Sequence, residues 1–128
     1  MAFLVGILAV PVVLTVEAFA VTILPYGYLL LFVWAVTEEL GKVVLAWFFV
    51  LQHRAVDEPI DFPIYLITVA LGFAAVENTL FLFTPLIDGA TITSAITGNL
   101  RFIGPTLIHV LGAAIVGGAM AFEFFRTT

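Results

Sequence analysis

Residues 26–51 read YGYLLLFVWAVTEELGKVVLAWFFVL, an apolar run whose only charged residues are Glu38, Glu39 and Lys42. About 20 mostly apolar residues are needed to cross the ~30 Å hydrocarbon core of a bilayer. Three further stretches meet this requirement, at residues 2–24, 63–86 and 99–125. The pattern predicts an all-α integral membrane protein, in which residues 1–128 form a single bundle of about four transmembrane helices.

The composition of the whole chain favours the same class. Hydrophobic residues make up 63% of the chain and charged residues only 10%, and the mean hydropathy is +1.25. A soluble domain keeps roughly a quarter of its residues charged, so this chain has too little polar surface for a soluble globule. Nucleic acid is excluded as a partner, because the net charge is −5 and the four basic residues are scattered. The absence of cysteine excludes disulfides, thiolate metal sites and cysteine nucleophiles.

Basic residues outside the spans predict the orientation in the membrane. The most polar segment, residues 52–61, contains Arg54, and Arg126 follows the fourth span. The other two connections, a turn at Pro25 and the segment that ends in the Thr-rich run 91–98, contain no Lys or Arg. Since Lys and Arg favour the cytoplasmic side, we expect a multi-pass protein of the cell membrane with both termini in the cytoplasm.

Ionisable residues inside the predicted spans form the most informative feature of the sequence. The second span contains Glu38, Glu39 and Lys42, the third contains Glu77 and the fourth contains His109. Such residues are costly at the bilayer centre and are usually functional. At ~1.5 Å per residue, the three glutamates and the histidine lie roughly 15–20 Å from the non-cytoplasmic side. Lys42 follows the two glutamates at helical spacing and can partly neutralise either one. We therefore favour a functional layer over a purely structural polar network.

Two other ionisable residues lie nearer the non-cytoplasmic edge. Snorkelling or mutual pairing would satisfy Glu17 and Arg101, so we assign Arg101 a supporting role and Glu17 a structural one. Residues 18–20 (Ala-Phe-Ala) resemble a signal-peptidase site, but the preceding Glu17 and the absence of upstream basic residues favour retention of the first helix.

The available residue types restrict the chemistry of the layer. The only serine, Ser94, lies in a loop without a G-x-S-x-G motif, and every aspartate lies at or beyond a helix end. No H-E-x-x-H zinc motif is present. A glutamate could take a proton from water while His109 donates to the leaving group or stabilises an oxyanion. Alternatively, Glu38 or Glu39 could join Glu77 and His109 as ligands of a divalent metal such as zinc, with one position left open.

Three motifs occur in order along the second to fourth spans. Glu38 to Lys42 match an E-E-x-x-K pattern, residues 73–78 match F-x-x-x-E-N, and His109 is followed by small residues. This order resembles the PrsW family of intramembrane proteases, distant relatives of the CAAX-processing and bacteriocin-processing membrane proteases. The resemblance implies peptide-bond hydrolysis in a membrane protein substrate, such as an anti-sigma factor, near the outer membrane face. It also implies that the catalytic residues are Glu38, Glu39, Glu77 and His109. The supporting residues that it implies are Lys42 and Asn78.

The leading hypothesis is therefore an intramembrane endopeptidase, whose partners are the lipid bilayer and a membrane protein or peptide substrate. An ion- or proton-coupled transporter or channel subunit is an alternative, because intramembrane carboxylates and histidines also build proton relays. Four spans are few for a transporter, so this alternative requires a homo-oligomer. A non-catalytic membrane scaffold is a third hypothesis, and it predicts that removing the charges leaves function intact.

Overall fold

The computed structural model contains four α-helices and one short π-helical segment. They are α1 (Ala2–Ile23), α2 (Tyr28–Ala46), η1 (Trp47–Leu51), α3 (Asp61–Ile87) and α4 (Thr91–Thr127). The structure describes the backbone of residues 1–87, 89 and 91–127, and the side chains of residues 1–84, 87, 89, 92–93, 96, 100 and 102–124. The all-α architecture predicted from the sequence is confirmed.

Among the residues that the structure describes, three helical segments are long and apolar enough to cross a membrane. The qualifying segments are Ala2–Ile23, Asp61–Thr84 and Phe102–Phe124. Helix α2 is 19 residues long but carries three charged residues, Glu38, Glu39 and Lys42, more than any of these three segments. Lys42 pairs with Glu39, and this pairing offsets part of the cost of placing charged side chains inside the bundle.

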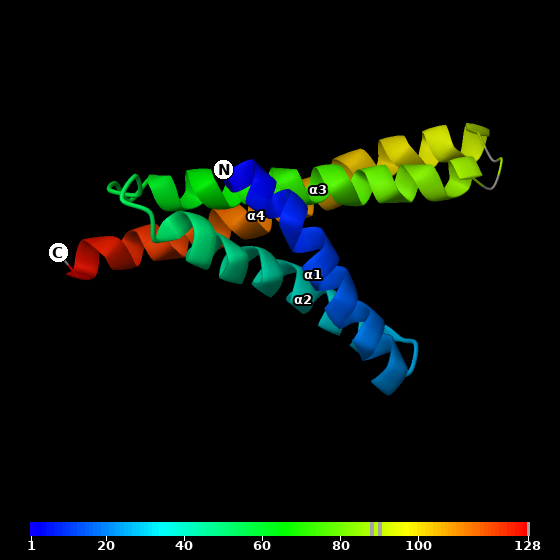
Figure 1. The fold of residues 1–128 in the computed structure, drawn as a ribbon, viewed down its shortest axis with the longest axis horizontal. Coiled ribbons are helices and arrows are strands. Elements are labelled where there is room, and N and C mark those ends of the chain that lie inside the picture. The colour runs from blue at the N-terminus through cyan, green and yellow to red at the C-terminus, as the bar shows by residue number, and fades with distance from the viewer. Residues whose placement is uncertain (88, 90, 128) are drawn as a thin grey trace.

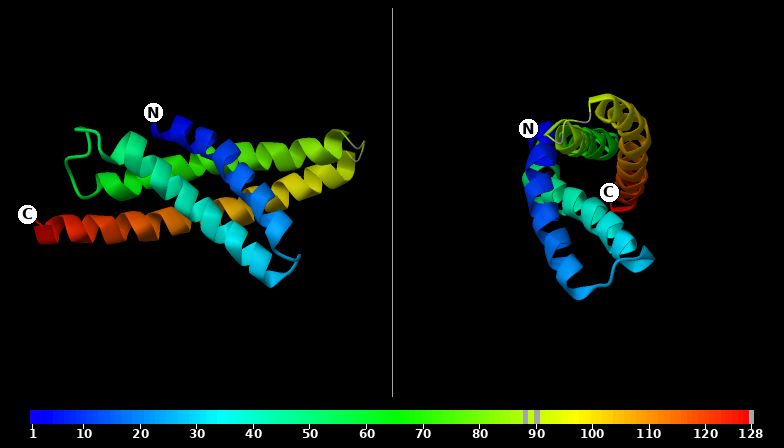
Figure 2. Two further views of the ribbon diagram at one scale, coloured as in Figure 1. Left: turned by 60° about the horizontal axis from the view of Figure 1, so that its bottom comes forward. Right: turned by 90° about the vertical axis from the view of Figure 1, so that its right-hand side faces the viewer.

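The chain folds as two helical hairpins that diverge from a common contact region. Helices α3 and α4 run antiparallel along their length, whereas α1 and α2 cross this pair obliquely (Figure 1). The left view of Figure 2 shows the α1–α2 turn and the α3–α4 turn toward the same end of the molecule but apart from one another, because the hairpins diverge. The molecule is therefore a splayed bundle, and the apolar core between the two hairpins lies along the first half of α3, from Phe62 to Phe73.

Glycines permit the close contact between α1 and α3. A side chain at Gly6 would overlap the carbonyl oxygen of Val69, and one at Gly72 would overlap that of Phe3. The backbones can approach this closely only because both positions lack a Cβ atom. Small and β-branched residues continue the packing on either side of the crossing, and Ala9 and Val69 are fully buried. This crossing fixes where α1 passes over the polar layer of the other helices.

Proline and aspartate define the ends of the helices near the 52–60 connection. The Asp61 carboxylate accepts hydrogen bonds from the backbone N–H groups of Asp57 and Glu58, at 3.2 and 3.0 Å. Pro63 lies in the first turn of α3, where its missing N–H group has no intrahelical partner to lose. The ring of Pro63 packs against Gly117, which leaves no room for a side chain at that glycine. This contact fixes the start of α3 against α4.

Helix α4 begins earlier than the sequence indicated. The Thr-rich run 91–98 was expected to lead into a helix at residue 99, but α4 begins at Thr91 and is 37 residues long. The predicted start rested on hydropathy, which marks the apolar part of a helix: the apolar segment Phe102–Phe124 lies inside the predicted span 99–125, and α4 extends beyond it toward the N-terminus. A helix satisfies its own backbone hydrogen bonds, which is decisive where water is scarce.

Candidate active site

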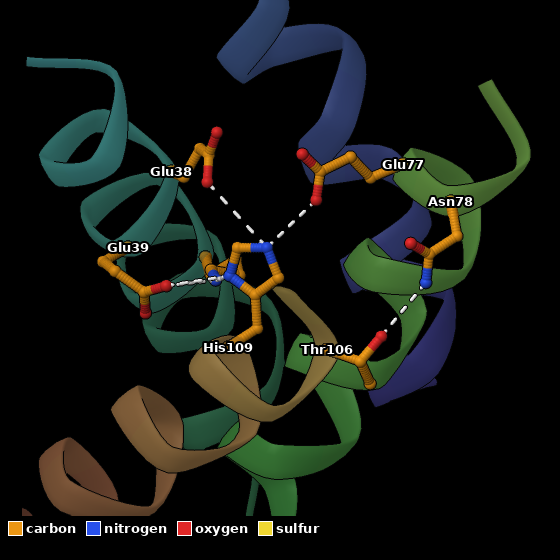
Figure 3. Close-up of polar contacts among 7 residues, drawn as sticks. Glu38, Glu39, Glu77, Asn78, Thr106 and His109 are labelled. Carbon is orange, nitrogen blue, oxygen red and sulfur yellow. Dashed lines mark hydrogen bonds and ion pairs between the residues drawn. The ribbon is translucent and has the colours of Figure 1, made fainter. Parts of the chain in front are cut away.

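Side chains from three helices converge where the two hairpins meet. Glu38 and Glu39 come from α2, Glu77 from α3 and His109 from α4, and the carboxylates surround the imidazole ring (Figure 3). His109 is 4% exposed. The four residues that the sequence placed in one layer are thus brought together by the fold.

The two nitrogens of His109 face different carboxylates. Nε2 lies 3.0 Å from Glu77 Oε2 and 3.9 Å from Glu38 Oε2, whereas Nδ1 lies 3.0 Å from Glu39 Oε1. The ring also packs edge-on against Phe73, with centroids 5.3 Å apart. One edge of the imidazole therefore faces Glu38 and Glu77 together, and the opposite edge faces Glu39.

Lys42 supplies the positive charge next to this cluster. Its ammonium group lies 2.6 Å from Glu39 Oε1 and 2.6 Å from His109 Nδ1, and the residue is 3% exposed. The same ammonium lies 4.9 Å from the centroid of the Phe73 ring, a favourable cation–π distance. Lys42, which the sequence predicts to be a supporting residue, lies against Glu39. It is on the side of His109 that faces away from Glu38 and Glu77.

Two further contacts hold the helices in register around His109. Asn78 donates a hydrogen bond of 3.0 Å to the hydroxyl of Thr106, which joins α3 to α4 one turn before His109 (Figure 3). A Cβ atom at Gly112 would lie 2.9 Å from Glu39 Oε2, so the carboxylate occupies space that only glycine leaves free. Thr106 and Gly112 were not singled out from the sequence, because threonines and glycines are common in this chain and carry no depth signal.

The donor set around His109 fits a divalent metal ion. One carboxylate oxygen each from Glu38 and Glu77 and a ring nitrogen of His109 lie within 4.8 Å of one another. Ligand bonds of ~2.0–2.1 Å in a tetrahedral zinc site place the ligand atoms about 3.3 Å apart, and the observed separations from Nε2 of 3.0 and 3.9 Å bracket this value. A histidine that binds a metal through one ring nitrogen is commonly oriented by a carboxylate at the other. Glu39 has this position at Nδ1 of His109.

A cavity of about 480 Å³ adjoins the cluster. Glu38 and Glu77 line it, and its other walls come from α1, α2 and α3 and are mostly apolar. Glu17 also lines this cavity, close enough to Glu38 and Glu77 to interact with both. The sequence placed Glu17 nearer the membrane edge, because residue counting alone does not reveal that α1 crosses the bundle obliquely. The predicted supporting residue Arg101 belongs to α4, but its side chain lies outside the described residues.

Comparisons with known proteins agree with the family that the motifs resemble. A family model described as the PrsW family intramembrane metalloprotease matches residues 1–128. Over 83 residues, or 65% of this chain, the sequence is 35% identical to "Protease PrsW" of Geobacillus kaustophilus (strain HTA426), of which the match covers 33%. It is 34% identical over 83 residues to "Protease PrsW" of Oceanobacillus iheyensis, again 65% of this chain and 35% of that protein.

The matched region spans about a third of the length of these curated relatives. No solved structure matches the chain. The family model nevertheless extends over the whole chain, including all three motif-bearing helices. The chain therefore belongs to the PrsW family of intramembrane metalloproteases.

Proposed function

We propose that this multi-pass membrane protein hydrolyses peptide bonds of a membrane protein substrate at the cluster of Glu38, Glu77 and His109. The observation that carries the proposal is the convergence of these three groups within 4.8 Å beside a largely apolar cavity. Buried ionisable groups that converge at a cavity are typical of a catalytic site. Family membership supports the reaction class.

The proposed metal ligands are Glu38, Glu77 and His109. When bound there, a divalent metal such as zinc would act as a Lewis acid toward a carbonyl group and would make water more acidic. Glu38 and Glu77 line the cavity, so their carboxylates are placed to accept a proton from water there. The peptide bond that reacts would be one that lies in the cavity.

The remaining residues of the cluster orient these groups. Glu39 contacts His109 Nδ1 and so directs Nε2 toward Glu38 and Glu77. Lys42 balances the negative charge of Glu39 across 2.6 Å. Asn78 and Thr106 hold α3 against α4 and thereby fix the distance between Glu77 and His109. These residues reduce the reorganisation that the cluster needs before reaction.

The test combines proteolysis with a metal measurement on the purified protein in liposomes. Wild-type protein is expected to cleave a co-reconstituted transmembrane peptide and to bind zinc. Glu77→Gln and His109→Ala should lower the cleavage rate by at least about 100-fold, a typical value for losing an acid or base group, and should also lower zinc content. Glu58→Gln is the matched control, because Glu58 is an exposed glutamate in the 52–60 connection.

Two outcomes would contradict the proposal. Undiminished cleavage by Glu38→Ala, Glu77→Gln and His109→Ala together would show that hydrolysis occurs elsewhere. Proton flux into the liposomes without any cleavage would favour the transporter hypothesis. Loss of cleavage with normal zinc content in all three variants would support the catalytic role of the cluster but would contradict its role as the metal-binding site.

A further inference from the structure

Two cavities adjoin one another where the start of α1 lies beside the end of α2. The first, here called the polar cavity, has a volume of about 350 Å³ and is lined by His53 of the 52–60 connection and by Tyr65 of α3, among others. The second, here called the apolar cavity, has about 570 Å³ and lies between α1 and the end of α2. Met1 and Phe49 line both cavities. They therefore form one continuous groove, which shares no lining residue with the cavity at the proposed active site.

One face of α1 forms a wall of the apolar cavity. Its lining residues include Leu4, Leu8 and Val12, which recur every four positions and so share one side of the helix. Leu8 is 64% exposed, so the groove is open at the outer surface of the bundle. At ~1.5 Å per residue, the wall from Met1 to Val12 is about 16 Å long. This is about half of the ~30 Å hydrocarbon core, which is the depth of one leaflet.

The π-helical segment η1 supplies the opposite wall. Trp47, Phe48 and Phe49 are three consecutive exposed side chains in this segment. The residues on either side of them, Ala46 and Val50, are buried. The i→i+5 hydrogen bonding of a π-helix makes its turn wider than an α-helical turn, so it can present three consecutive side chains outward. Such segments occur frequently at functional sites, and here the wider turn places Phe49 in the wall of the groove.

Hydrogen-bond donors lie at only one end of the groove. His53 Nδ1 accepts a hydrogen bond of 3.2 Å from the backbone N–H group of Ala55, so the neutral ring carries its proton on Nε2. The hydroxyl of Tyr65 is a second donor, and both residues line the polar cavity. Tyrosine rings are enriched at the headgroup level of a bilayer. The residues that line the apolar cavity are all hydrophobic.

We propose that this groove binds one phospholipid molecule, with an acyl chain along Leu4, Leu8 and Val12 and the phosphate accepting hydrogen bonds from His53 and Tyr65. The change from donors to hydrophobic walls over the depth of one leaflet matches a lipid that carries a phosphate above an acyl chain. A transmembrane helix of a second copy satisfies its own backbone groups, so it would not need the two donors. The proposed site does not depend on proteolysis at His109.

The test uses native mass spectrometry of the purified full chain in detergent, titrated with three probes. Dioleoyl phosphatidylglycerol has the acyl chains and the phosphate, dioleoylglycerol has the chains alone, and glycerol phosphate has the phosphate alone. We expect saturation at one phosphatidylglycerol per chain. Dioleoylglycerol should bind at least about tenfold more weakly, as expected for the loss of hydrogen bonds to a charged group. Glycerol phosphate should not bind.

The phosphate contact is tested by His53→Phe, which keeps an aromatic ring but removes the Nε2–H donor. Affinity for phosphatidylglycerol should fall about tenfold, and affinity for dioleoylglycerol should not change. Tyr65→Phe should have the same selective effect. Gln52→Leu is the matched control, because Gln52 is an exposed neighbour that lines neither cavity. It should leave the affinity for both lipids unchanged.

The acyl-chain contact is tested by filling the apolar cavity. Leu8→Trp places a large ring in the groove and should weaken binding of both lipid probes at least about tenfold, because it occupies the space that the chain needs. Val16→Trp is the matched control on the same helix, because Val16 is 47% exposed and lines neither cavity. Thermal unfolding of the two variants should match that of the wild type, since both positions are exposed.

Three outcomes would overturn the inference. Equal affinities for phosphatidylglycerol and dioleoylglycerol would mean that His53 and Tyr65 do not bind the phosphate. Binding of many lipids without saturation, unaffected by Leu8→Trp, would mean that the groove meets only bulk lipid. A dimer that carries no lipid and that Leu8→Trp dissociates would make the groove an interface between two copies of the chain. None of these outcomes bears on proteolysis at the Glu38, Glu77 and His109 cluster.

Discussion

The imidazole of His109 has contacts that a single tautomer cannot satisfy. When the Lys42 ammonium donates to Nδ1 at 2.6 Å, Nδ1 carries no proton, and the ring donates from Nε2 to Glu77. In that tautomer Nδ1 and Glu39 Oε1, which lie 3.0 Å apart, are both acceptors, and the Lys42 ammonium donates to both of them. A metal at Nε2 requires the other tautomer, in which Nδ1–H donates to Glu39 and Lys42 contacts Glu39 alone. The Glu39–Lys42 pair therefore serves both states of the ring.

Zinc affinity should depend on Glu39 although Glu39 is not among the proposed ligands. In Glu39→Ala, Nδ1 loses its acceptor and the charge of Lys42 is left uncompensated beside the site. Both effects oppose a bound dication, so zinc affinity should fall about tenfold to 100-fold, as for other outer-shell partners of a histidine ligand. Competition with a chromogenic chelator measures the change. Unaltered affinity would mean that Glu39 does not orient His109.

Gly112 should be intolerant of a single methyl group. In Gly112→Ala, the new Cβ atom lies 2.9 Å from Glu39 Oε2, so the carboxylate must leave its present position, in which it contacts His109. Gly118→Ala is the matched control on the same helix, because nothing lies within 4 Å of a Cβ atom there. We expect the first variant to lose proteolytic activity by at least about tenfold and the second to retain it. Equal activities would show that the position of Glu39 is not critical.

Counting residues along the spans was sufficient to predict the Glu38, Glu39, Glu77 and His109 layer, because helical rise converts sequence position into depth. Counting could not identify Thr106 as the partner of Asn78 or Gly112 as the space for Glu39, since these depend on which faces of α3, α4 and α2 meet. It also could not bring Glu17 to Glu38, because that proximity depends on the angle of α1.

At the level of helices, the oblique contact of α1 with α3 determines the shape of the cavity. Hydrophobic runs of similar length predict that spans exist but give no crossing angle, which side-chain packing at the interface sets. Gly6 and Gly72 allow the backbones to touch, and beyond this contact α1 diverges from α3 along the cavity. These glycines were not recognised in the sequence, because they lie on different helices and no periodic motif connects them.

An added methyl group should therefore destabilise the fold where α1 touches α3 and should be tolerated where no neighbouring atom is close. In Gly72→Ala, the added Cβ overlaps the Phe3 carbonyl oxygen, and the backbones must move apart. We expect a loss of about 3 kcal/mol in unfolding free energy, the upper end for overpacking, measured by titration with a denaturing detergent. Gly104→Ala is the control, because a Cβ atom there has nothing within 4 Å. Equal stabilities would show that the crossing adjusts freely.

In the whole molecule, the places of the connections and of the chain ends restrict how the chain can be oriented in a membrane. The 52–60 connection and the end of α4 lie at one end of the α3–α4 pair, and the α3–α4 turn lies at the other (Figure 1). The α1–α2 turn also lies away from the 52–60 connection in the left view of Figure 2. Four crossings would consequently place both chain ends on the side of Arg54, which the positive-inside tendency assigns to the cytoplasm.

Single cysteines can test this orientation, because the chain contains none of its own. Tyr26→Cys places a thiol in the α1–α2 turn at a position that is 82% exposed, and His53→Cys places one in the 52–60 connection. If Arg54 is cytoplasmic, a membrane-impermeant maleimide added to intact cells should label the Tyr26→Cys variant and should label His53→Cys only after permeabilisation. The reverse pattern would invert the predicted orientation. Labelling of both variants in intact cells would place the two connections on the same side, which means that α2 does not cross the membrane despite its length.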